Sequence, residues 1–185
     1  MSPRNKEPLL TLPGGSQDHT AGPADAPLTL VEYGDYQCPY CGKAFPIVKE
    51  VRRQLDTQLR FVFRNFPLTQ IHPHAQHAAE AAEAGAAQGA FWPMHDRLFE
   101  RQFALDDESL VSYAADLGLD ADRFRQELIA GTYGKRVRDD FMSGVRSGVN
   151  GTPTFFINGR RHDGDYDLES LLAALRAAVP SLAAG

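Results

Sequence analysis

The chain has 185 residues, of which 43% are hydrophobic, and a formal net charge of -5 at pH 7. This length suits one domain, or one domain with an insertion, and supplies enough apolar residues for a core that needs no disulfide to fold. The acidic balance argues against nucleic-acid binding, which needs clustered Lys and Arg. No apolar run reaches the 18 residues of a membrane-spanning helix, so we expect neither nucleic acid nor a membrane as a partner.

The first 27 residues predict a flexible N-terminal segment or an irregular edge. Residues 1–27 hold five of the 12 prolines and show no sustained hydrophobic period. We therefore expect ordered structure to begin at Pro27. The segment lacks the apolar core of a signal peptide, which predicts a cytoplasmic protein for the sequence as written. Removal of a leader from the natural chain would change this expectation to an exported protein.

Two strands and a helix follow. The β-branched, apolar run "LTLVEY" at residues 28–33 predicts a buried strand, which ends at a Gly-Asp turn signal. A helix is expected from Pro39 to about Leu55, with Pro46 inside it as a kink. "LRFVFRNF" at residues 59–66 then predicts a second strand.

The composition changes over the next eighty residues. Alanine and helix-capping residues replace the apolar and β-branched residues that are typical of strands. Residues 67–148 therefore predict a helical insertion. The expected helices cover 73–89, 91–103, 107–118, 120–131 and 134–145. Within them, the aromatic residues Phe91, Trp92 and Phe99 are expected to form the core of the insertion.

The last part of the chain predicts a hairpin and a helix. In "TFFINGRRH" at residues 154–162, the Asn-Gly pair suits a two-residue type I′ turn between strands. Residues 168–179 predict an amphipathic helix with Leu171, Leu172, Leu175 and Val179 facing inward. This order of strands and helices indicates an α/β fold with a small sheet.

The only two cysteines, Cys38 and Cys41, form a Cys-X-X-Cys pair between the first strand and the first helix. At this position the N-H groups and the macrodipole of the helix favour a thiolate on Cys38, so we interpret Cys38 as the nucleophile and Cys41 as the resolving thiol. A zinc site and an inert reduced pair are the alternatives. A zinc site would take two further ligands from His72, His74, His77 and His95.

Two further features support redox chemistry. Glu32 lies within the apolar strand before the cysteines, where it either sits buried with a raised pKa and relays the proton of Cys41, or faces solvent at an edge. "GVNGTPTFF" predicts a tight loop through Thr152 and Pro153 that leads into a strand. From the sequence alone, the Thr152-Pro153 bond is expected to be trans.

The ordered motifs "DYQCPYC", "FRNFPL", "IHPHAQHAAEAA", "QGAFWPMHDRLF" and "NGTPTFFING" give the chain a resemblance to the DsbA-like branch of the thioredoxin superfamily, from about Asp18 to Val179. The resemblance implies a thioredoxin fold with an inserted α-helical domain. Residues 28–66 and 149–185 would form the core, and residues 67–148 the insertion.

The resemblance also implies roles for individual residues. Cys38 would be an exposed nucleophile with a low pKa, Cys41 the resolving thiol and Glu32 the buried carboxylate. Thr152 and Pro153 would form a cis-proline loop that faces the pair and holds a substrate polypeptide by strand-like pairing.

The dipeptide between the cysteines departs from the Pro-His of the strongly oxidising DsbA proteins. Pro39 and Tyr40 replace it, and we expect both to contact substrate and the couple to be less oxidising than DsbA. Tyr36 and Phe66 are candidates to extend an apolar docking surface around Tyr40. His72 is interpreted as a helix cap or a packing residue.

We therefore expect a thiol-disulfide oxidoreductase that acts on cysteine-containing polypeptides together with a redox partner, without a bound cofactor or metal. The alternatives are a glutathione-linked oxidoreductase and a non-enzymatic module that binds a metal through its thiols or acts as a chaperone.

Overall fold

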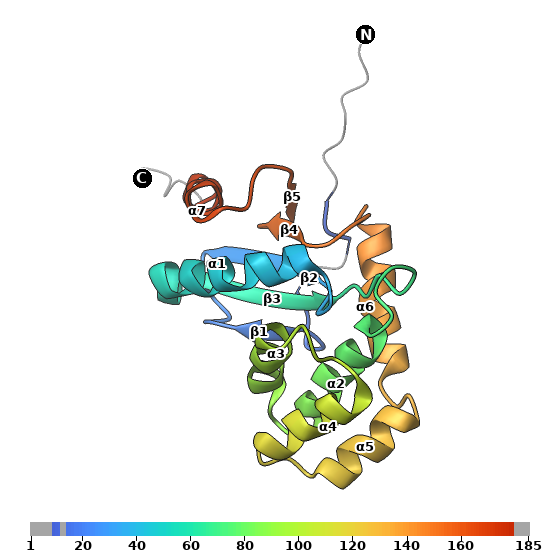
Figure 1. The fold of residues 1–185 in the computed structure, drawn as a ribbon. Coiled ribbons are helices and arrows are strands. Elements are labelled where there is room, and N and C mark those ends of the chain that lie inside the picture. Colours follow the sequence, from blue (N-terminus) through green and yellow to red (C-terminus); the bar gives the residue numbers. More distant parts are fainter. Residues whose placement is uncertain (1–8, 12–13, 180–185) are drawn as a thin grey trace.

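A computed structural model describes residues 9–11 and 14–179 of the chain (Figure 1). The strands are β1 (His19–Ala21), β2 (Leu28–Gly34), β3 (Leu59–Asn65), β4 (Thr154–Ile157) and β5 (Arg160–His162). The α-helices are α1 (Pro39–Leu55), α2 (Ala75–Ala87), α3 (Phe91–Glu100), α4 (Asp107–Asp116), α5 (Ala121–Ile129), α6 (Gly134–Arg146) and α7 (Leu168–Ala177). A short 3-10 helix covers Asp56–Gln58. No helix in the described ranges is both long enough and apolar enough to cross a membrane.

The five strands form one mixed sheet in the order β1-β3-β2-β4-β5. Strands β2 and β3 are parallel, and the other neighbours are antiparallel. The central strand β2 is buried along almost its whole length, as its continuous apolar run predicts. In this strand Glu32 is paired with Phe63 on one side and Phe155 on the other. The strand therefore places a carboxyl group in the middle of the sheet.

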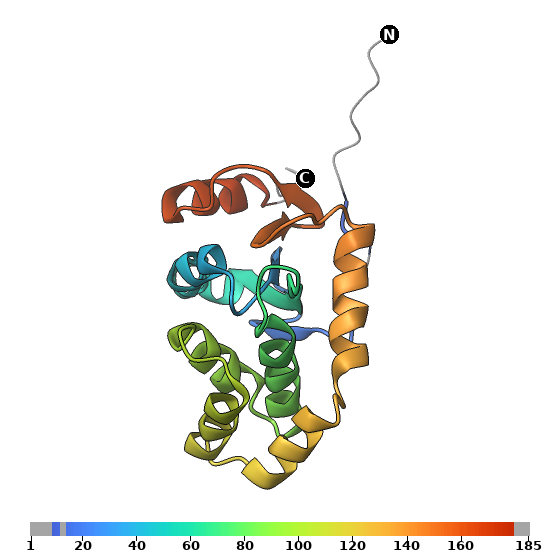
Figure 2. The ribbon, with the colours of Figure 1, turned by 45° about the vertical axis from the view of Figure 1, so that its right-hand side comes forward.

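Helices cover both faces of the sheet. Figure 2 shows α1 and α7 on one side and α6 on the other. Alternate residues of β2 point to opposite faces, so Leu28 and Leu30 join the core under α1, whereas Val31 and Tyr33 join the core on the side of α6. Glu32 lies two residues after Leu30, so the two side chains point to the same face of the sheet. Its side chain therefore belongs to the face that α1 covers.

Helices α2 to α6 form the predicted insertion between β3 and β4, and α2 to α5 gather below the sheet in Figure 1. Local chemistry sets their ends. The side chains of Asp106 and Asp120 accept hydrogen bonds from backbone N-H groups at the beginning of α4 and α5. Gly89 and Gly131 have positive φ just after α2 and α5, where a left-handed residue ends a helix.

The Asn-Gly hairpin is also present. Asn158 and Gly159 have φ of 46° and 81°, the positive values that a type I′ turn requires at both positions. The last helix is shorter than predicted, because α7 ends at Ala177. Leu171, Leu172 and Leu175 are buried as expected. Val179 is 42% exposed, so the prediction that it faces inward is wrong.

Strand β1 lies within the N-terminal segment that the sequence predicts to be flexible, so that prediction is wrong for residues 19–21. Three residues are too few to show a hydrophobic period, and distant contacts hold them. β1 pairs with β3, and the carboxylate of Asp18 accepts two hydrogen bonds from the guanidinium of Arg64, at 2.8 and 3.0 Å. The Arg64 side chain is 1% exposed. A buried cation needs such a partner, which explains why the chain is ordered here.

Candidate active site

The two thiols lie where β2 leads into α1. Strand β2 ends at Gly34, and the chain makes one turn before α1 begins at Pro39, with Cys38 as its N-cap residue. A proline at the first position suits a helix entrance because the missing N-H would have no helical partner there. Cys41 lies in the first turn of α1 and is fully buried. Both cysteines are free thiols.

The surroundings of Cys38 favour its thiolate. A hydrogen bond from the thiol of Cys41 is the largest cause that lowers the pKa of Cys38, to about 5 from an ordinary 9.0. Burial opposes this shift, while Thr152 and the backbone N-H groups of Tyr40 and Cys41 add to it. The helix entrance therefore contributes as predicted, but the neighbouring thiol contributes more.

Cys41 is held in the opposite state. Burial raises the pKa of its thiol well above the ordinary value, and the charges of Cys38 and Glu32 act in the same direction. The backbone N-H of Asp35 donates to Cys41 Sγ at 3.4 Å. Near neutral pH the thiolate form is therefore favoured for Cys38 and the thiol form for Cys41.

The loop before β4 closes the site on the other side. The Thr152-Pro153 peptide bond is cis, as the family resemblance implies and contrary to the expectation from the sequence alone. In its thiol form Cys38 donates to the carbonyl oxygen of Thr152 at 3.4 Å. Residues 114 positions apart are therefore in contact, and the backbone of this loop lies beside the sulfur of Cys38.

Glu32 is buried and not at a solvent-facing edge. Glu32 is 3% exposed, and its Oε1 has no hydrogen-bond partner among the described residues. Burial is the main cause that raises the pKa of Glu32 to about 8, and the charge of Cys38 contributes. A carboxyl group with this pKa can gain or lose a proton near neutral pH, which general acid-base chemistry requires.

The exposed surface at the site is smaller than predicted. Cys38 is only 3% exposed, so the implied exposed nucleophile is wrong, and its Sγ lies 3.4 Å from the carbonyl oxygen of Thr152. Pro39 is exposed, and Tyr40 is 58% exposed. Tyr36 and Phe66 are buried and cannot form a docking surface with Tyr40. A partner can therefore contact Pro39 and Tyr40 first.

Sequence reasoning missed the role of Asp35, which it took for part of a turn signal. The carboxylate is buried and accepts hydrogen bonds from the backbone N-H groups of Gln37 and Leu68, at 2.8 and 2.9 Å. It also lies 2.7 Å from Nδ1 of His72. Asp35 thus joins the turn before α1 to the loop after β3. An Asp that binds an N-H two residues ahead is a recognised turn device, which was the available signal.

Three of the four histidines considered as metal ligands, His72, His77 and His95, have other side-chain partners. His72 contacts Asp35 instead of capping α2, so the cap interpretation is wrong. His77 lies 2.6 Å from Asp107, and Nδ1 of His95 lies 3.0 Å from the hydroxyl of Tyr36. Within residues 9–11 and 14–179, no three His, Cys, Asp or Glu side chains are grouped to hold a metal ion.

The aromatic residues of the insertion lie in the core. Phe91 and Phe99 are buried in the main hydrophobic core, and Trp92 packs against it.

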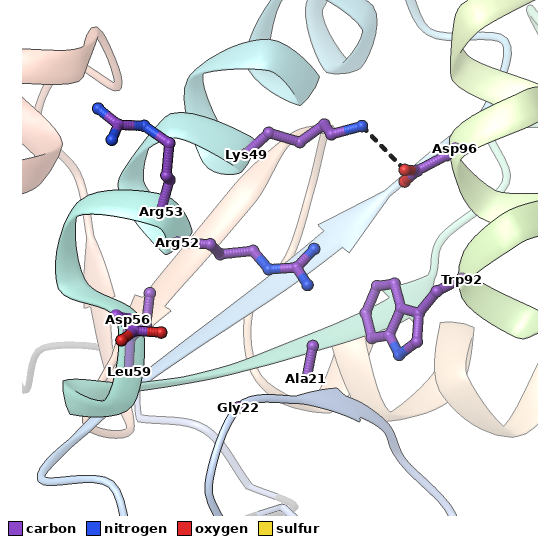
Figure 3. Close-up of a pocket in the computed structure, with 9 residues that line it drawn as sticks. All are labelled: Ala21, Gly22, Lys49, Arg52, Arg53, Asp56, Leu59, Trp92 and Asp96. Carbon is purple, nitrogen blue, oxygen red and sulfur yellow. Dashed lines mark hydrogen bonds and ion pairs between the residues drawn. The ribbon is translucent and has the colours of Figure 1, made fainter.

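A pocket of about 370 Å³ lies at the opposite end of α1 from the cysteines (Figure 3). Lys49, Arg52 and Arg53 line this pocket and could bind the carboxylates of glutathione. However, Lys49 forms an ion pair with Asp96 at 2.9 Å. The guanidinium of Arg52 lies 5.1 Å from the centre of the Trp92 ring. Arg52 lies thirteen positions after Pro39 along the helix, or about 20 Å at 1.5 Å per residue. A ligand here would not reach the thiols.

Comparison with known proteins places this geometry in a family. The family described as Thioredoxin matches residues 15–177. The chain belongs to the thioredoxin family. Within this family, the Cys-X-X-Cys pair at a helix entrance, opposite a cis-proline loop, is the feature that bears on chemistry.

Relatives of this thioredoxin-family chain include much longer proteins. The Na(+)/H(+) antiporter NhaA 1 of Salinispora arenicola (strain CNS-205) is 51% identical over 162 residues, which are 88% of this chain and 25% of the antiporter. The Na(+)/H(+) antiporter NhaA of Herminiimonas arsenicoxydans is 48% identical over 160 residues, 86% of this chain and 25% of that protein. The chain spans about a quarter of the length of these relatives. The antiporter activity that these names describe is an activity of the longer proteins.

Solved structures share the fold. BdbD from Bacillus subtilis has a TM-score of 0.81 at 22% identity, covering 88% of this chain and 93% of its own. A thioredoxin-like oxidoreductase from Silicibacter pomeroyi DSS-3 has a TM-score of 0.76 at 25% identity, covering 95% of each chain. The alpha-DsbA1 of Wolbachia pipientis has 0.73 at 23%, covering 92% and 94%. The predicted DsbA-like thioredoxin fold with a helical insertion is confirmed.

Proposed function

We propose that this chain is a DsbA-like thiol-disulfide oxidoreductase that exchanges disulfides with cysteine-containing polypeptides. The observation that carries the proposal is the geometry of the pair: Cys38 is the N-cap residue of α1 beside the cis-proline loop, and Cys41 is buried in the first turn of the helix. The pKa shifts agree with it, because the pKa of Cys38 falls to about 5 and that of Cys41 rises well above its ordinary value. In such a pair one sulfur can attack a substrate disulfide, and the other can then resolve the mixed disulfide.

The first step is attack on a substrate disulfide. The thiolate of Cys38 forms a bond to one substrate sulfur, and the other substrate sulfur leaves as a thiolate. This mixed disulfide joins Cys38 to the polypeptide. The cis-proline loop supports polypeptide binding at this step, because the backbone beside Cys38 Sγ can pair with an extended segment of substrate.

The second step resolves the mixed disulfide. Cys41 loses its proton, attacks Cys38 Sγ, and releases the second substrate sulfur as a thiolate, so the substrate is reduced by two electrons and the cysteine pair is oxidised. The burial of Cys41 makes its proton loss unfavourable, and Glu32 is electrostatically coupled to it. In the mixed disulfide Cys38 carries no charge, so one cause of the raised pKa of Glu32 is gone, and we propose that the ionised Glu32 accepts this proton. The reverse sequence oxidises a dithiol substrate.

The lowered pKa also bears on the direction of electron flow. A stabilised thiolate favours the reduced pair, so the disulfide becomes the better oxidant. The pKa of Cys38, about 5, lies between about 7 for thioredoxin and about 3.5 for DsbA. We therefore propose a reduction potential between those of the two proteins, roughly -270 and -120 mV.

Trapping the first intermediate tests the substrate class. Reduced Cys41→Ser protein should accumulate a mixed disulfide with a disulfide-containing polypeptide such as insulin, because the resolving sulfur is gone. In a mixture with equal concentrations of insulin and oxidised glutathione, non-reducing mass spectrometry should show the insulin adduct forming several-fold faster. The Cys38→Ser/Cys41→Ser double variant, as the control, should form neither adduct. A glutathione adduct that forms faster than the insulin adduct would instead support the glutathione-linked alternative.

A further inference from the structure

The helical insertion reaches the active-site turn through one polar side chain that the proposed steps do not use. Gln102 lies between α3 and α4, more than sixty positions from the cysteines in sequence. Its Nε2 donates to the carbonyl oxygen of Tyr36 at 2.7 Å and to that of Cys38 at 3.0 Å. A side-chain amide has two N-H donors, so both bonds form together. One group therefore holds the backbone on both sides of Gln37.

The position of this amide is closely defined by the helix it contacts. A methyl group added at Gly42, in the first turn of α1, would collide with Oε1 of Gln102. The carbonyl of Cys38 also accepts the helical bond from the N-H of Gly42, at 3.0 Å. The Gln102 amide thus lies against the start of α1 only because residue 42 has no side chain.

A second side chain of the insertion holds the same turn. The ring of Tyr36 packs 4.8 Å from the ring of Phe99 and 5.3 Å from that of Phe63, measured between centroids. Its hydroxyl lies 3.0 Å from Nδ1 of His95, which belongs to α3. Burial lowers the pKa of His95 well below its ordinary value and raises the pKa of Tyr36, so both groups are neutral and share one hydrogen bond. The side chain of Tyr36 is thereby fixed, and Gln102 fixes its carbonyl.

We propose that Gln102 is a positioning residue for the nucleophile: by holding the carbonyls of Tyr36 and Cys38, it keeps the N-H groups at the entrance of α1 directed at Cys38 Sγ. The helical insertion thereby adjusts the stability of the thiolate, through hydrogen bonds of Gln102 to the backbone and not to the sulfur. This inference rests on the proposed role of Cys38. It adds a contact that sets how readily Cys38 ionises.

Replacing the amide with an apolar side chain of similar length tests the proposal. Gln102→Met should raise the pKa of Cys38 by about half a unit to one unit, the scale of one or two lost hydrogen bonds. The equilibrium constant with glutathione should shift about three- to tenfold toward the oxidised pair. Gln102→Glu, which has no N-H to donate, should shift both at least as far. Thiolate absorbance at 240 nm against pH and titration in glutathione buffers supply the readouts.

The matched control is Gln88→Met. Gln88 also bridges a backbone segment with its amide, to the carbonyl and N-H of Asp120, but entirely within the insertion. It should change the melting temperature without moving the pKa of Cys38. If Gln102→Met likewise leaves the pKa and the equilibrium constant at their wild-type values, the role is merely structural and the proposal is wrong.

Gly42→Ala tests the same contact by displacing the Gln102 amide without changing Gln102 itself. The added methyl group pushes the amide of Gln102 away, so this variant should raise the pKa of Cys38 as Gln102→Met does, and the double variant should show no further rise. Full additivity of the two shifts would contradict a shared contact. A wild-type Cys38 that ionises like free cysteine would end the proposed function itself, whereas unchanged variants of a low-pKa wild type end only this inference.

Discussion

Cys38→Ser should abolish thiol-disulfide exchange, with a loss of at least about 10³-fold in the catalysed reduction of insulin. A serine hydroxyl has no accessible anion near neutral pH and cannot form the mixed disulfide, whereas the thiolate of Cys38 is the dominant form above a pKa of about 5. Cys41 cannot replace it, because its pKa is raised well above the ordinary value and it is fully buried. The measurement is the initial rate of insulin precipitation with dithiothreitol as reductant.

The control for this variant is its fold. Cys38 is an N-cap residue that makes no side-chain cap hydrogen bond, so serine should leave α1 and the melting temperature essentially intact. Retained turnover in a correctly folded Cys38→Ser protein would mean that another group performs the exchange. That outcome would overturn the assignment of both sulfurs.

Glu32→Gln should stabilise the protein at neutral pH, by on the order of 3 kcal/mol in free energy of unfolding at pH 7. The reason is the pKa of Glu32, raised from 4.5 to about 8 in the folded chain. Between these values the folded state keeps a proton that the unfolded state has lost, so the free energy of unfolding falls as pH rises. The amide carries no ionisable proton, and this part of the pH dependence should disappear.

Urea denaturation of the reduced protein at several pH values between 5 and 8 measures the effect. Wild type should lose stability across this range relative to Glu32→Gln, and the difference should be smaller in the oxidised protein, because a disulfide removes the Cys38 charge that contributes to the shift. Parallel pH profiles for the two proteins would show that Glu32 ionises at its ordinary pKa. In that case it would be too weak a base to serve as an efficient proton acceptor for Cys41.

The sequence was sufficient for the elements that form by local rules. The buried run at 28–33, the Asn-Gly hairpin and the Asp-capped helices of the insertion all carry their signal within a few residues. Strand β1 carries none, because its three residues are ordered by pairing with β3 and by the ion pair of Asp18 with Arg64. Such long-range contacts are invisible to periodicity.

The same distinction applies to the site. The cysteine pair could be found from its spacing and position, and the contact of Thr152 with Cys38 only from the resemblance, since 114 positions separate them. The hydrogen bonds of Asp35 and Gln102 depend on where distant loops return to the turn before α1. The burial of Cys38 was missed for the same reason, because the Thr152 carbonyl beside its sulfur comes from a distant part of the chain.

The measurement that tests the central claim most directly is a pH titration of thiolate absorbance at 240 nm on the reduced wild-type protein, with Cys38→Ser for comparison. Wild type should show one sulfur ionising near pH 5 and the second only above the range of free cysteine, and the transition near pH 5 should be missing from Cys38→Ser. Two sulfurs that ionise together near the ordinary cysteine pKa of 9.0 would contradict the account.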